Sequence, residues 1–337
     1  MRRILGALML AMLAWINPAL ARVEKLTVHS PAIEGNLEGN SADRTVYVIL
    51  PPSYDAAKKR RFPVVYFLHG YLATADKYMD YVPFDKALTD AGKGPQEVIV
   101  VVPDSYTKFG GSFYSNSLTV GNFEDYITRD LIGYVDGHYR TLAKRESRGL
   151  AGHSMGGYGT LRLGMKHPDL FSSLYAMNPC CLRPRPAEIL LPQYEGLTPE
   201  QVLAGDFYTK GNFGIATAWS PNPGKPPFFA DLATKDGKPD YEVLARWWAN
   251  APVAMASQYL PSLKAMHAIA LDTGDTDFVQ ADVVAMHEML NKLNVPHDWE
   301  LYVGDHGNRV PARFAEKVLP FFARHLSAAP MPGRKGH

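Results

Sequence analysis

The sequence predicts an α/β protein built on a mostly parallel sheet of eight strands, with helices on both faces. Three observations support this fold class: eight short runs rich in β-branched or aromatic residues, helical patterns between most of them, and a globular composition. Hydrophobic residues make up 46% of the 337 residues and charged residues 20%, with 35 Lys+Arg against 34 Asp+Glu. This balance excludes an intrinsically disordered chain, and it is too neutral for a protein that binds nucleic acid through its charge.

The first 21 residues have the pattern of a secretory signal peptide. Arg2 and Arg3 precede an apolar run over 4–16, and small residues stand at Ala19 and Ala21. The run is shorter than the roughly 20 residues that cross a bilayer, which favours a cleaved signal over a membrane anchor. We therefore expect cleavage after Ala21 and a secreted or periplasmic protein with no stable membrane anchor.

The body of the chain, 22–327, alternates between strand and helix patterns. Eight strands are expected, at 25–29, 45–50, 64–68, 98–102, 149–153, 173–177, 268–272 and 298–303. From the third strand onward helical patterns separate them, among them 123–139, 155–166, 281–293 and 311–326. Such alternation implies right-handed crossovers and parallel neighbours, with the first strands as an antiparallel edge. We expect a single domain, followed by a flexible tail at 328–337.

A long stretch at about 182–261 interrupts this alternation. It is rich in proline, glycine and aromatic residues and lacks the periodicity of a strand. It leaves the sheet after one strand and returns before the next, so both its ends lie near the carboxyl edge of the sheet. Long insertions at such a place are usually binding loops or lids, and we expect this one to shape a substrate pocket through Trp219, Trp247 or Trp248. In the alternative interpretation these tryptophans only pack the insertion onto the body.

A candidate nucleophile follows the fifth expected strand. Ser154 lies at the centre of a Gly-x-Ser-x-Gly motif at 152–156, where the helical pattern 155–166 begins. A serine on such a sharp turn needs small neighbours, because a Cβ there would clash as the backbone closes. The N-terminus of the following helix would favour the negative charge that develops when the serine attacks a carbonyl group.

The general base and its acid are expected on loops after later strands. His306 is the one histidine in a loop directly after the last expected strand, so we assign it as the base. The loop at 273–278 offers two acids, with Asp277 the first choice and Asp275 the second. The acid would hold one imidazole N–H so that the other nitrogen can accept the serine proton. The remaining aspartate would cap a helix or order the loop.

The oxyanion hole is expected at a His-Gly turn, 69–70, that follows the third strand. The backbone N–H groups of Tyr71 and Met155 are the candidate donors to the oxyanion. In the structural alternative the turn is an ordinary β-turn, which is compatible with that role.

The two cysteines, Cys180 and Cys181, are neighbours in the sequence. Adjacent cysteines bridge only through a strained ring. We therefore expect two small buried residues at a strand end rather than a redox pair.

Taken together, these motifs resemble the esterase D and antigen 85-like group of α/β-hydrolases. The matching pieces are 67–70, 121–126, 129–131, 151–159, 166–168, 274–277, His306 and 308–309. They occur in the family's order between about 46 and 322. The resemblance implies an α/β-hydrolase domain without metal or organic cofactor, with the elbow serine, the late histidine and the last acid of the 274–277 loop as catalytic residues. It thus favours Asp277 over Asp275.

The resemblance implies a serine carboxylesterase that acts on a small-molecule or carbohydrate-linked ester through an acyl-enzyme. The family's S-formylglutathione hydrolases act on a cytosolic substrate, which the expected signal peptide argues against. An acyltransferase of the antigen 85 type would use the same triad with an alcohol in place of water. A non-catalytic binding protein on this scaffold should have lost a triad member, and none is missing.

Overall fold

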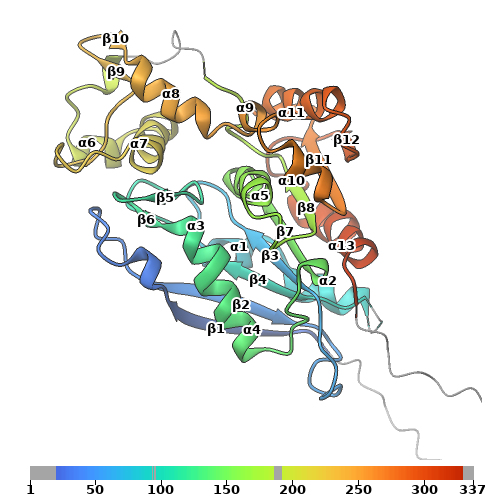
Figure 1. Ribbon diagram of the computed structural model, residues 1–337. Helices are drawn as coiled ribbons and strands as arrows, with labels where there is room; N and C mark the ends of the chain where they lie inside the picture. The colour runs from blue at the N-terminus through green and yellow to red at the C-terminus, as the bar shows by residue number, and fades with distance from the viewer. Residues whose placement is uncertain (1–19, 93, 95, 186–191, 329–337) are drawn as a thin grey trace, which may run out of the picture.

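The protein is built around one central sheet (Figure 1). The computed structural model describes residues 20–328 apart from 93, 95 and 186–191. The expected signal segment up to residue 19 and the expected tail from residue 329 lie outside these residues. The eight strands of the sheet are β1 (Arg22–His29), β2 (Asp43–Leu50), β3 (Val64–Leu68), β4 (Ile99–Pro103), β7 (Arg148–His153), β8 (Ser173–Met177), β11 (Ala268–Gly274) and β12 (Asp298–Tyr302).

The strand order is β1-β2-β4-β3-β7-β8-β11-β12. β1 and β2 pair antiparallel, as do β2 and β4, and every later neighbour is parallel. The expected mixed sheet with an antiparallel edge is therefore confirmed. The parallel strands β4, β3, β7, β8, β11 and β12 all end at the same edge of the sheet, so the loops that follow them meet there.

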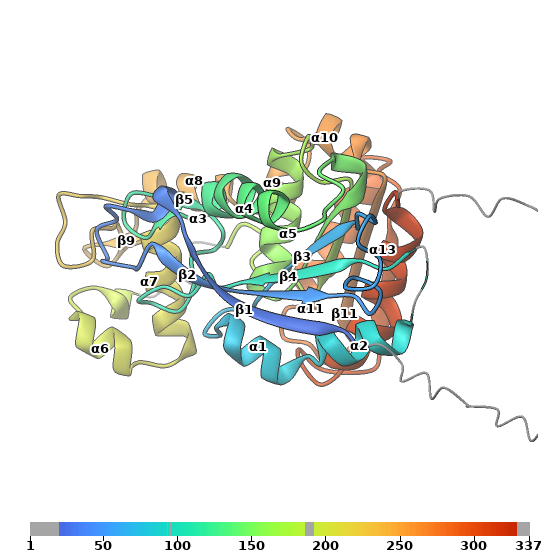
Figure 2. The same ribbon diagram turned by 90° about the horizontal axis from the view of Figure 1, so that it is seen from below.

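Helices cover both faces of the sheet (Figure 2). On the central strand β3, Val64, Tyr66 and Leu68 face one apolar core, while Val65 and Phe67 face the other. Strands buried on both sides need such continuous apolar runs. The first core includes α3 (Phe123–Asp125), α4 (Ile132–His138), α5 (Met155–Lys166) and α11 (Gln280–Lys292), and the second α1 (Ala75–Tyr81), α2 (Phe84–Ala91), α12 (Val310–Arg313) and α13 (Leu319–His325).

Shorter elements complete the body. π-Helical turns at Tyr126–Leu131 and Phe314–Val318 join α3 to α4 and α12 to α13, so each expected long helix is one interrupted helix. Turns of 3-10 helix lie at Pro31–Ile33, Arg145–Ser147 and Pro192–Tyr194. A small hairpin pairs β5 (Asn116–Ser117) with β6 (Gly121–Asn122).

The insertion is largely helical in its described residues, which the composition of this stretch did not indicate. Its elements are α6 (Pro199–Ala204), α7 (Phe207–Trp219), β9 (Thr234–Lys235), β10 (Lys238–Pro239), α8 (Tyr241–Ala249), α9 (Pro252–Met255) and α10 (Leu260–Ala265). The side chains of Thr198, Asp206 and Asp240 accept backbone N–H bonds at the starts of α6, α7 and α8, which explains where these helices begin. In Figure 1 α6 to α8 stand beyond the β5–β6 hairpin, away from β1.

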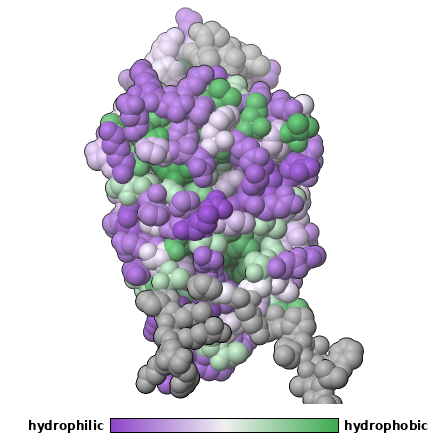
Figure 3. Space-filling view, turned by 90° about the vertical axis from the view of Figure 1, so that its right-hand side faces the viewer, coloured by the Kyte–Doolittle hydropathy of each residue, from purple (hydrophilic) through white to green (hydrophobic). Residues whose placement is uncertain are grey.

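The surface formed by the C-terminal helices is mostly hydrophilic, with hydrophobic residues in separate groups (Figure 3). Among the helices of residues 20–328 that the structure describes, none is long and apolar enough to cross a membrane.

Candidate active site

The structure brings Ser154, His306 and Asp277 together at the carboxyl edge of the sheet. Ser154 follows β7, Asp277 lies in the loop after β11, and His306 in the loop after β12. The Ser154 Oγ is 2.9 Å from His306 Nε2, and His306 Nδ1 is 2.9 and 3.0 Å from the two Asp277 carboxylate oxygens. A carboxylate only accepts, so Nδ1–H donates to Asp277 and the Nε2 lone pair faces the serine hydroxyl. This arrangement can remove the proton of Ser154.

Ser154 occupies a strained turn that its glycine neighbours permit. Its φ of 57° and ψ of −118° lie in a region that side chains rarely adopt. A Cβ on Gly152 would collide with the backbone of Gly156, and a Cβ on Gly156 would collide with the Leu68 carbonyl. Glycine is therefore required at both positions for β7, α5 and β3 to approach one another around the serine.

Asp277 is held as an ionised acceptor. Its side chain is fully buried and accepts hydrogen bonds from the Val279 N–H, at 2.9 Å, and from the Asn178 amide. Burial alone would raise the pKa of Asp277, but the hydrogen bond and charge of His306, together with the hydrogen bonds from Val279 and Asn178, keep the pKa below its ordinary value. The carboxylate can therefore stabilise a positive charge on His306.

Asp275 performs a different task. Its Oδ1 accepts the Gly304 N–H at 3.0 Å, while its own N–H donates to the Tyr302 carbonyl at 2.8 Å. These bonds join the loop after β11 to the loop that carries His306. Asp275 thus orders the two loops, and among the described residues it forms no hydrogen bond or ion pair with the imidazole ring of His306.

His153, the second residue of the serine motif, supports the loop that carries His306. Its Nε2–H donates to the His306 carbonyl at 2.7 Å, and the Tyr78 hydroxyl donates to its Nδ1 at 2.6 Å. Burial and then the charge of His306 lower the pKa of His153 to about 3, so the ring stays neutral and keeps both bonds. Sequence reasoning missed this residue, although its place beside Ser154 at the end of β7 was a usable signal.

The two expected oxyanion donors flank Ser154. A Cβ placed on Gly70 would lie 3.3 Å from the Ser154 Cβ, so the turn that carries the Tyr71 N–H passes directly beside the serine. Met155 is the first residue of α5, where N–H groups have no partner within the helix. Among the described residues neither N–H has a hydrogen-bond acceptor. Both donors are thus available for a bound oxygen atom.

His69 fixes the shape of the turn beside Ser154. Its Nδ1–H donates to the Gly70 carbonyl at 2.9 Å, and its Nε2 accepts the Ser105 N–H at 2.7 Å. Burial lowers the pKa of His69, which keeps this neutral tautomer in place. The turn is therefore positioned before any substrate binds.

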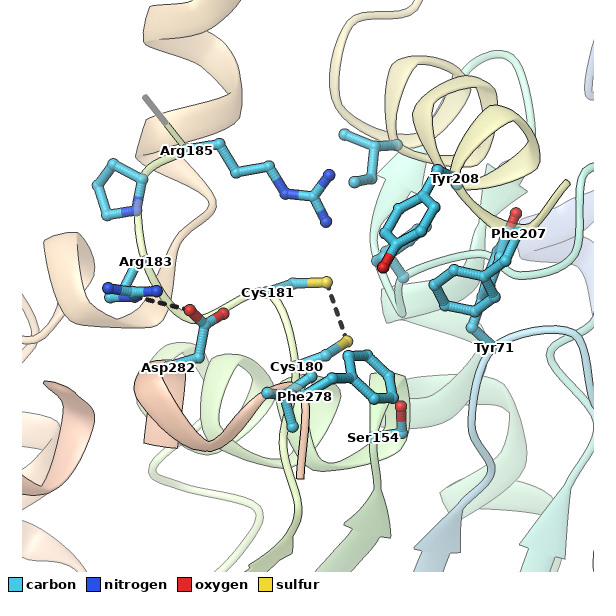
Figure 4. A pocket seen from close by; sticks show the side chains of 15 residues that line it. Tyr71, Ser154, Cys180, Cys181, Arg183, Arg185, Phe207, Tyr208, Phe278 and Asp282 are labelled. Carbon is cyan, nitrogen blue, oxygen red and sulfur yellow. Dashed lines mark hydrogen bonds and ion pairs between the residues drawn. The ribbon is translucent and has the colours of Figure 1, made fainter. Parts of the chain in front are cut away.

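A pocket of about 340 Å³ opens beside Ser154 (Figure 4). Five aromatic side chains line it: Tyr71, Phe113, Phe207, Tyr208 and Phe278. Three of these large side chains remain exposed, Phe207 by 46% and Tyr208 and Phe278 by 63% each. Phe207 and Tyr208 come from the insertion and Phe278 from the loop of Asp277, so the insertion does form part of the pocket wall. Exposed aromatic groups around a cavity are suited to cover an apolar part of a ligand.

The structure does not bring Trp219, Trp247 and Trp248 to this pocket. They line a crevice of about 10 Å³ behind the wall segment 181–185. Trp219 and Trp247 are only 8% and 4% exposed, and their indole N–H groups donate to the hydroxyls of Ser115 and Ser220. The expected direct contact of these tryptophans with substrate therefore finds no support in their positions; they pack the insertion and support the pocket wall from behind.

Cys180 and Cys181 are free thiols in the pocket wall rather than core residues. Their sulfur atoms lie 2.9 Å apart. The hydrogen bond to Cys180 lowers the pKa of Cys181 against the effect of burial, and Arg185 adds to this lowering. In the part of the chain that the structure describes, no three His, Cys, Asp or Glu side chains are grouped to hold a metal ion.

Comparison with known sequences gives one family. Residues 40–312 match the family model described as "Putative esterase". An esterase of Mycobacterium tuberculosis is 33% identical over 135 residues, which are 38% of this chain and 27% of that protein. The S-formylglutathione hydrolase of Bos taurus is 27% identical over 153 residues, 40% of this chain and 51% of that protein. The chain therefore matches between 27% and 51% of the length of these curated relatives.

Solved structures show the same α/β-hydrolase fold over 91% of this chain. A ferulic acid esterase has a TM-score of 0.66 at 20% identity, and 99% of its chain is covered. The S-formylglutathione hydrolase of Staphylococcus aureus has a TM-score of 0.61 at 18% identity, and MPT51 of Mycobacterium tuberculosis one of 0.59 at 14%, each with 99% covered. At these identities the likeness concerns the fold.

Proposed function

Because the chain belongs to the "Putative esterase" family, we propose that it is a serine hydrolase that cleaves a carboxylic ester through an acyl-enzyme on Ser154. The observation that carries this proposal is the hydrogen-bonded series from Asp277 through His306 to Ser154 at the wall of an open pocket. The three side chains are connected in the order acid, base and nucleophile, which nucleophilic catalysis by serine requires.

Acylation begins with the serine hydroxyl. As Ser154 Oγ forms a bond to the ester carbonyl carbon, its proton passes to His306 Nε2, and the carbonyl oxygen becomes an oxyanion. The carboxylate of Asp277 stabilises the resulting imidazolium through Nδ1–H. The intermediate then collapses: the bond from the carbonyl carbon to the alcohol oxygen breaks, and the alcohol leaves with the proton from Nε2.

The oxyanion is assigned to the backbone N–H groups of Tyr71 and Met155. The support is their position on either side of Ser154 and the absence of an acceptor for them among the described residues. Removing one such donor in comparable sites costs roughly 3 kcal/mol of transition-state stabilisation. Deacylation repeats the same steps with water as the nucleophile, and releases the acid and free Ser154.

The substrate is proposed to be a small-molecule ester, free or linked to a carbohydrate. A cavity of about 340 Å³ with aromatic walls suits a small organic group. Two fold neighbours are named ferulic acid esterases, and one of them was solved in complex with ferulic acid. A panel of p-nitrophenyl esters of graded chain length, together with methyl ferulate, tests the proposal. Hydrolysis of none of them by the folded protein would contradict it.

Export is a further part of this proposal. The support is the sequence pattern that ends at Ala21; cleavage there leaves all of β1, which begins at Arg22, in the mature protein. N-terminal sequencing of protein recovered outside the cytoplasm should give Arg22 as the first residue. Recovery of chains that still begin at Met1 would contradict cleavage.

A further inference from the structure

The pocket wall at 181–185 carries two arginines with different surroundings. Arg183 pairs with Asp282, its Nε 2.7 Å from the carboxylate, and Asp282 also accepts the Leu182 N–H at 3.0 Å. The charge of Arg183 is therefore neutralised within the wall. Arg185 differs from Arg183, since among the described residues no carboxylate lies within ion-pair distance of its guanidinium.

The side chain of Arg185 reaches into the pocket. Figure 4 shows its guanidinium in the space between Cys181 and Tyr208, whereas Arg183 turns away towards Asp282. The Arg185 carbonyl accepts the indole N–H of Trp248 at 2.9 Å, which fixes the backbone from behind. Among the described residues that line the pocket, the charged side chains are Arg183, Arg185 and Asp282, so this part of the lining carries one more positive than negative charge.

We propose that this pocket selects esters with an anionic group, such as a carboxylate, that binds to the guanidinium of Arg185. The inference rests on the proposed esterase function and specifies its substrate class. The anionic group belongs to the part of the substrate that fills the aromatic pocket beside Ser154, which can be the acyl or the alcohol part.

The chemistry of the wall favours this class. A guanidinium presents a planar set of N–H donors that match both oxygens of a carboxylate, and such charge-assisted pairs are stronger than neutral hydrogen bonds. Arg185 is only partly exposed and stands among aromatic and thiol groups, so its charge is screened less than that of a surface arginine. An ester with an apolar group in that place leaves these donors to water, and one with a neutral acceptor binds them less strongly.

The test compares matched esters. On the acyl side, mono-p-nitrophenyl adipate is compared with p-nitrophenyl hexanoate, in which a methyl group replaces the terminal carboxylate. On the alcohol side, p-carboxymethylphenyl butyrate is compared with p-methylphenyl butyrate. In one of the two pairs, the wild-type ratio of kcat/KM for the anionic over the neutral ester should exceed that of Arg185→Gln by roughly tenfold. Arg185→Glu should lower the ratio further.

The double variant Arg183→Gln with Asp282→Asn is the matched control. It removes both members of the neutral pair and leaves the charge of Arg185, and an asparagine can still accept the Leu182 N–H. The ratio should stay within about twofold of wild type, since one positive charge remains. If Arg185→Gln does not fold, the wild-type ratio is measured from about 0.02 to about 0.5 M NaCl, where screening should reduce it.

The outcomes distinguish a failure of the inference from a failure of the proposed esterase function. If the wild-type protein hydrolyses the neutral esters and shows equal ratios in wild type and Arg185→Gln, or a ratio that salt does not change, the inference is wrong and the esterase function stands. If it hydrolyses none of the four esters but does hydrolyse members of the panel of p-nitrophenyl esters and methyl ferulate, the inference alone is wrong. If it hydrolyses none of the four and none of the panel, the proposed function fails, and the inference fails with it.

Discussion

The two walls of the pocket differ in how their side chains are held. Around Ser154 the polar groups have fixed partners: His306 contacts Asp277, its carbonyl accepts from His153, and Asp275 joins the two loops. On the insertion side the lining side chains are exposed aromatic groups and an arginine with no carboxylate partner in the described chain. We call the side around Ser154 the paired wall and the other side the insertion wall. The paired wall is positioned before a ligand binds, whereas the insertion wall leaves hydrogen-bond donors and apolar surface for a ligand.

This difference assigns a separate task to each wall. Chemistry that forms and breaks bonds requires groups held to within a fraction of an ångström, which the paired wall provides. Selection among esters requires contacts that one substrate makes and another lacks, which the insertion wall provides. Changes in the first wall should therefore slow all esters alike, and changes in the second should alter the ratios between them.

The largest effect should follow from Ser154→Ala. Without the nucleophile no acyl-enzyme forms, and comparable deletions cost on the order of 10⁶ in kcat. Neutral and anionic esters should lose activity by the same factor, because the loss lies in the chemical step. Measured turnover above a tenth of wild type, with the fold checked by circular dichroism, would remove Ser154 from its role.

The next largest effect should separate the two aspartates. Asp277→Asn should lose about 10⁴ in kcat, because an amide can favour the wrong imidazole tautomer. Asp275→Asn is the matched control: its amide oxygen can still accept the Gly304 N–H, so its loss should be far smaller. Steady-state kinetics of both variants decide the matter, and a reversed ranking would transfer the orienting role to Asp275.

A smaller effect should distinguish the exposed aromatic residues from the buried tryptophans. Tyr208→Ala should change the ratio of kcat/KM between aromatic and short aliphatic esters by roughly tenfold, since its ring lines the pocket. Trp247→Ala should instead lower the free energy of unfolding by about 3–5 kcal/mol and leave that ratio unchanged. If Trp247→Ala altered the ratio and Tyr208→Ala did not, the assignment of the two groups would have to be exchanged.

The smallest effect concerns acid stability in the paired wall. In the unfolded chain His153 gains a proton below about pH 6.5, whereas its folded pKa is about 3. The folded state therefore loses stability as the pH falls from about 6.5 to about 3, and it keeps its full stability above about pH 6.5. Relative to His153→Gln, the wild-type free energy of unfolding should fall by up to about 1.4 kcal/mol per pH unit. Urea unfolding between about pH 4 and 7 measures it, and parallel curves would contradict the buried neutral state.

The paired wall was largely predictable from sequence. Ser154, Asp277 and His306 each follow a strand that the sequence predicts, and parallel strands end at one edge of the sheet. Local patterns therefore located three side chains that are far apart in the chain. Asp277 was the first choice over Asp275, and the family resemblance strengthened that choice; the local pattern left both open, because the two carboxylates lie in one loop.

The insertion wall was not predictable in this way. Aromatic content alone cannot tell a tryptophan packed behind a wall, such as Trp248, from a tyrosine in front of it, such as Tyr208; only tertiary packing decides. The helices of the insertion carried a local signal that was available, namely the capping residues Asp206 and Asp240 at their starts. Arg185 had no sequence signal, since its importance depends on where Asp282 lies.

The central claim, an acyl-enzyme on Ser154, is tested most directly by trapping that intermediate. Protein is quenched in acid during turnover of a p-nitrophenyl ester, and peptide mass spectrometry locates the added acyl group. Cys181 is the competing nucleophile, because it lines the same pocket and has a lowered pKa. The account predicts the acyl group on Ser154 in the wild-type protein and no acyl adduct in Ser154→Ala. An acyl group on Cys181, with turnover retained in Ser154→Ala, would contradict it.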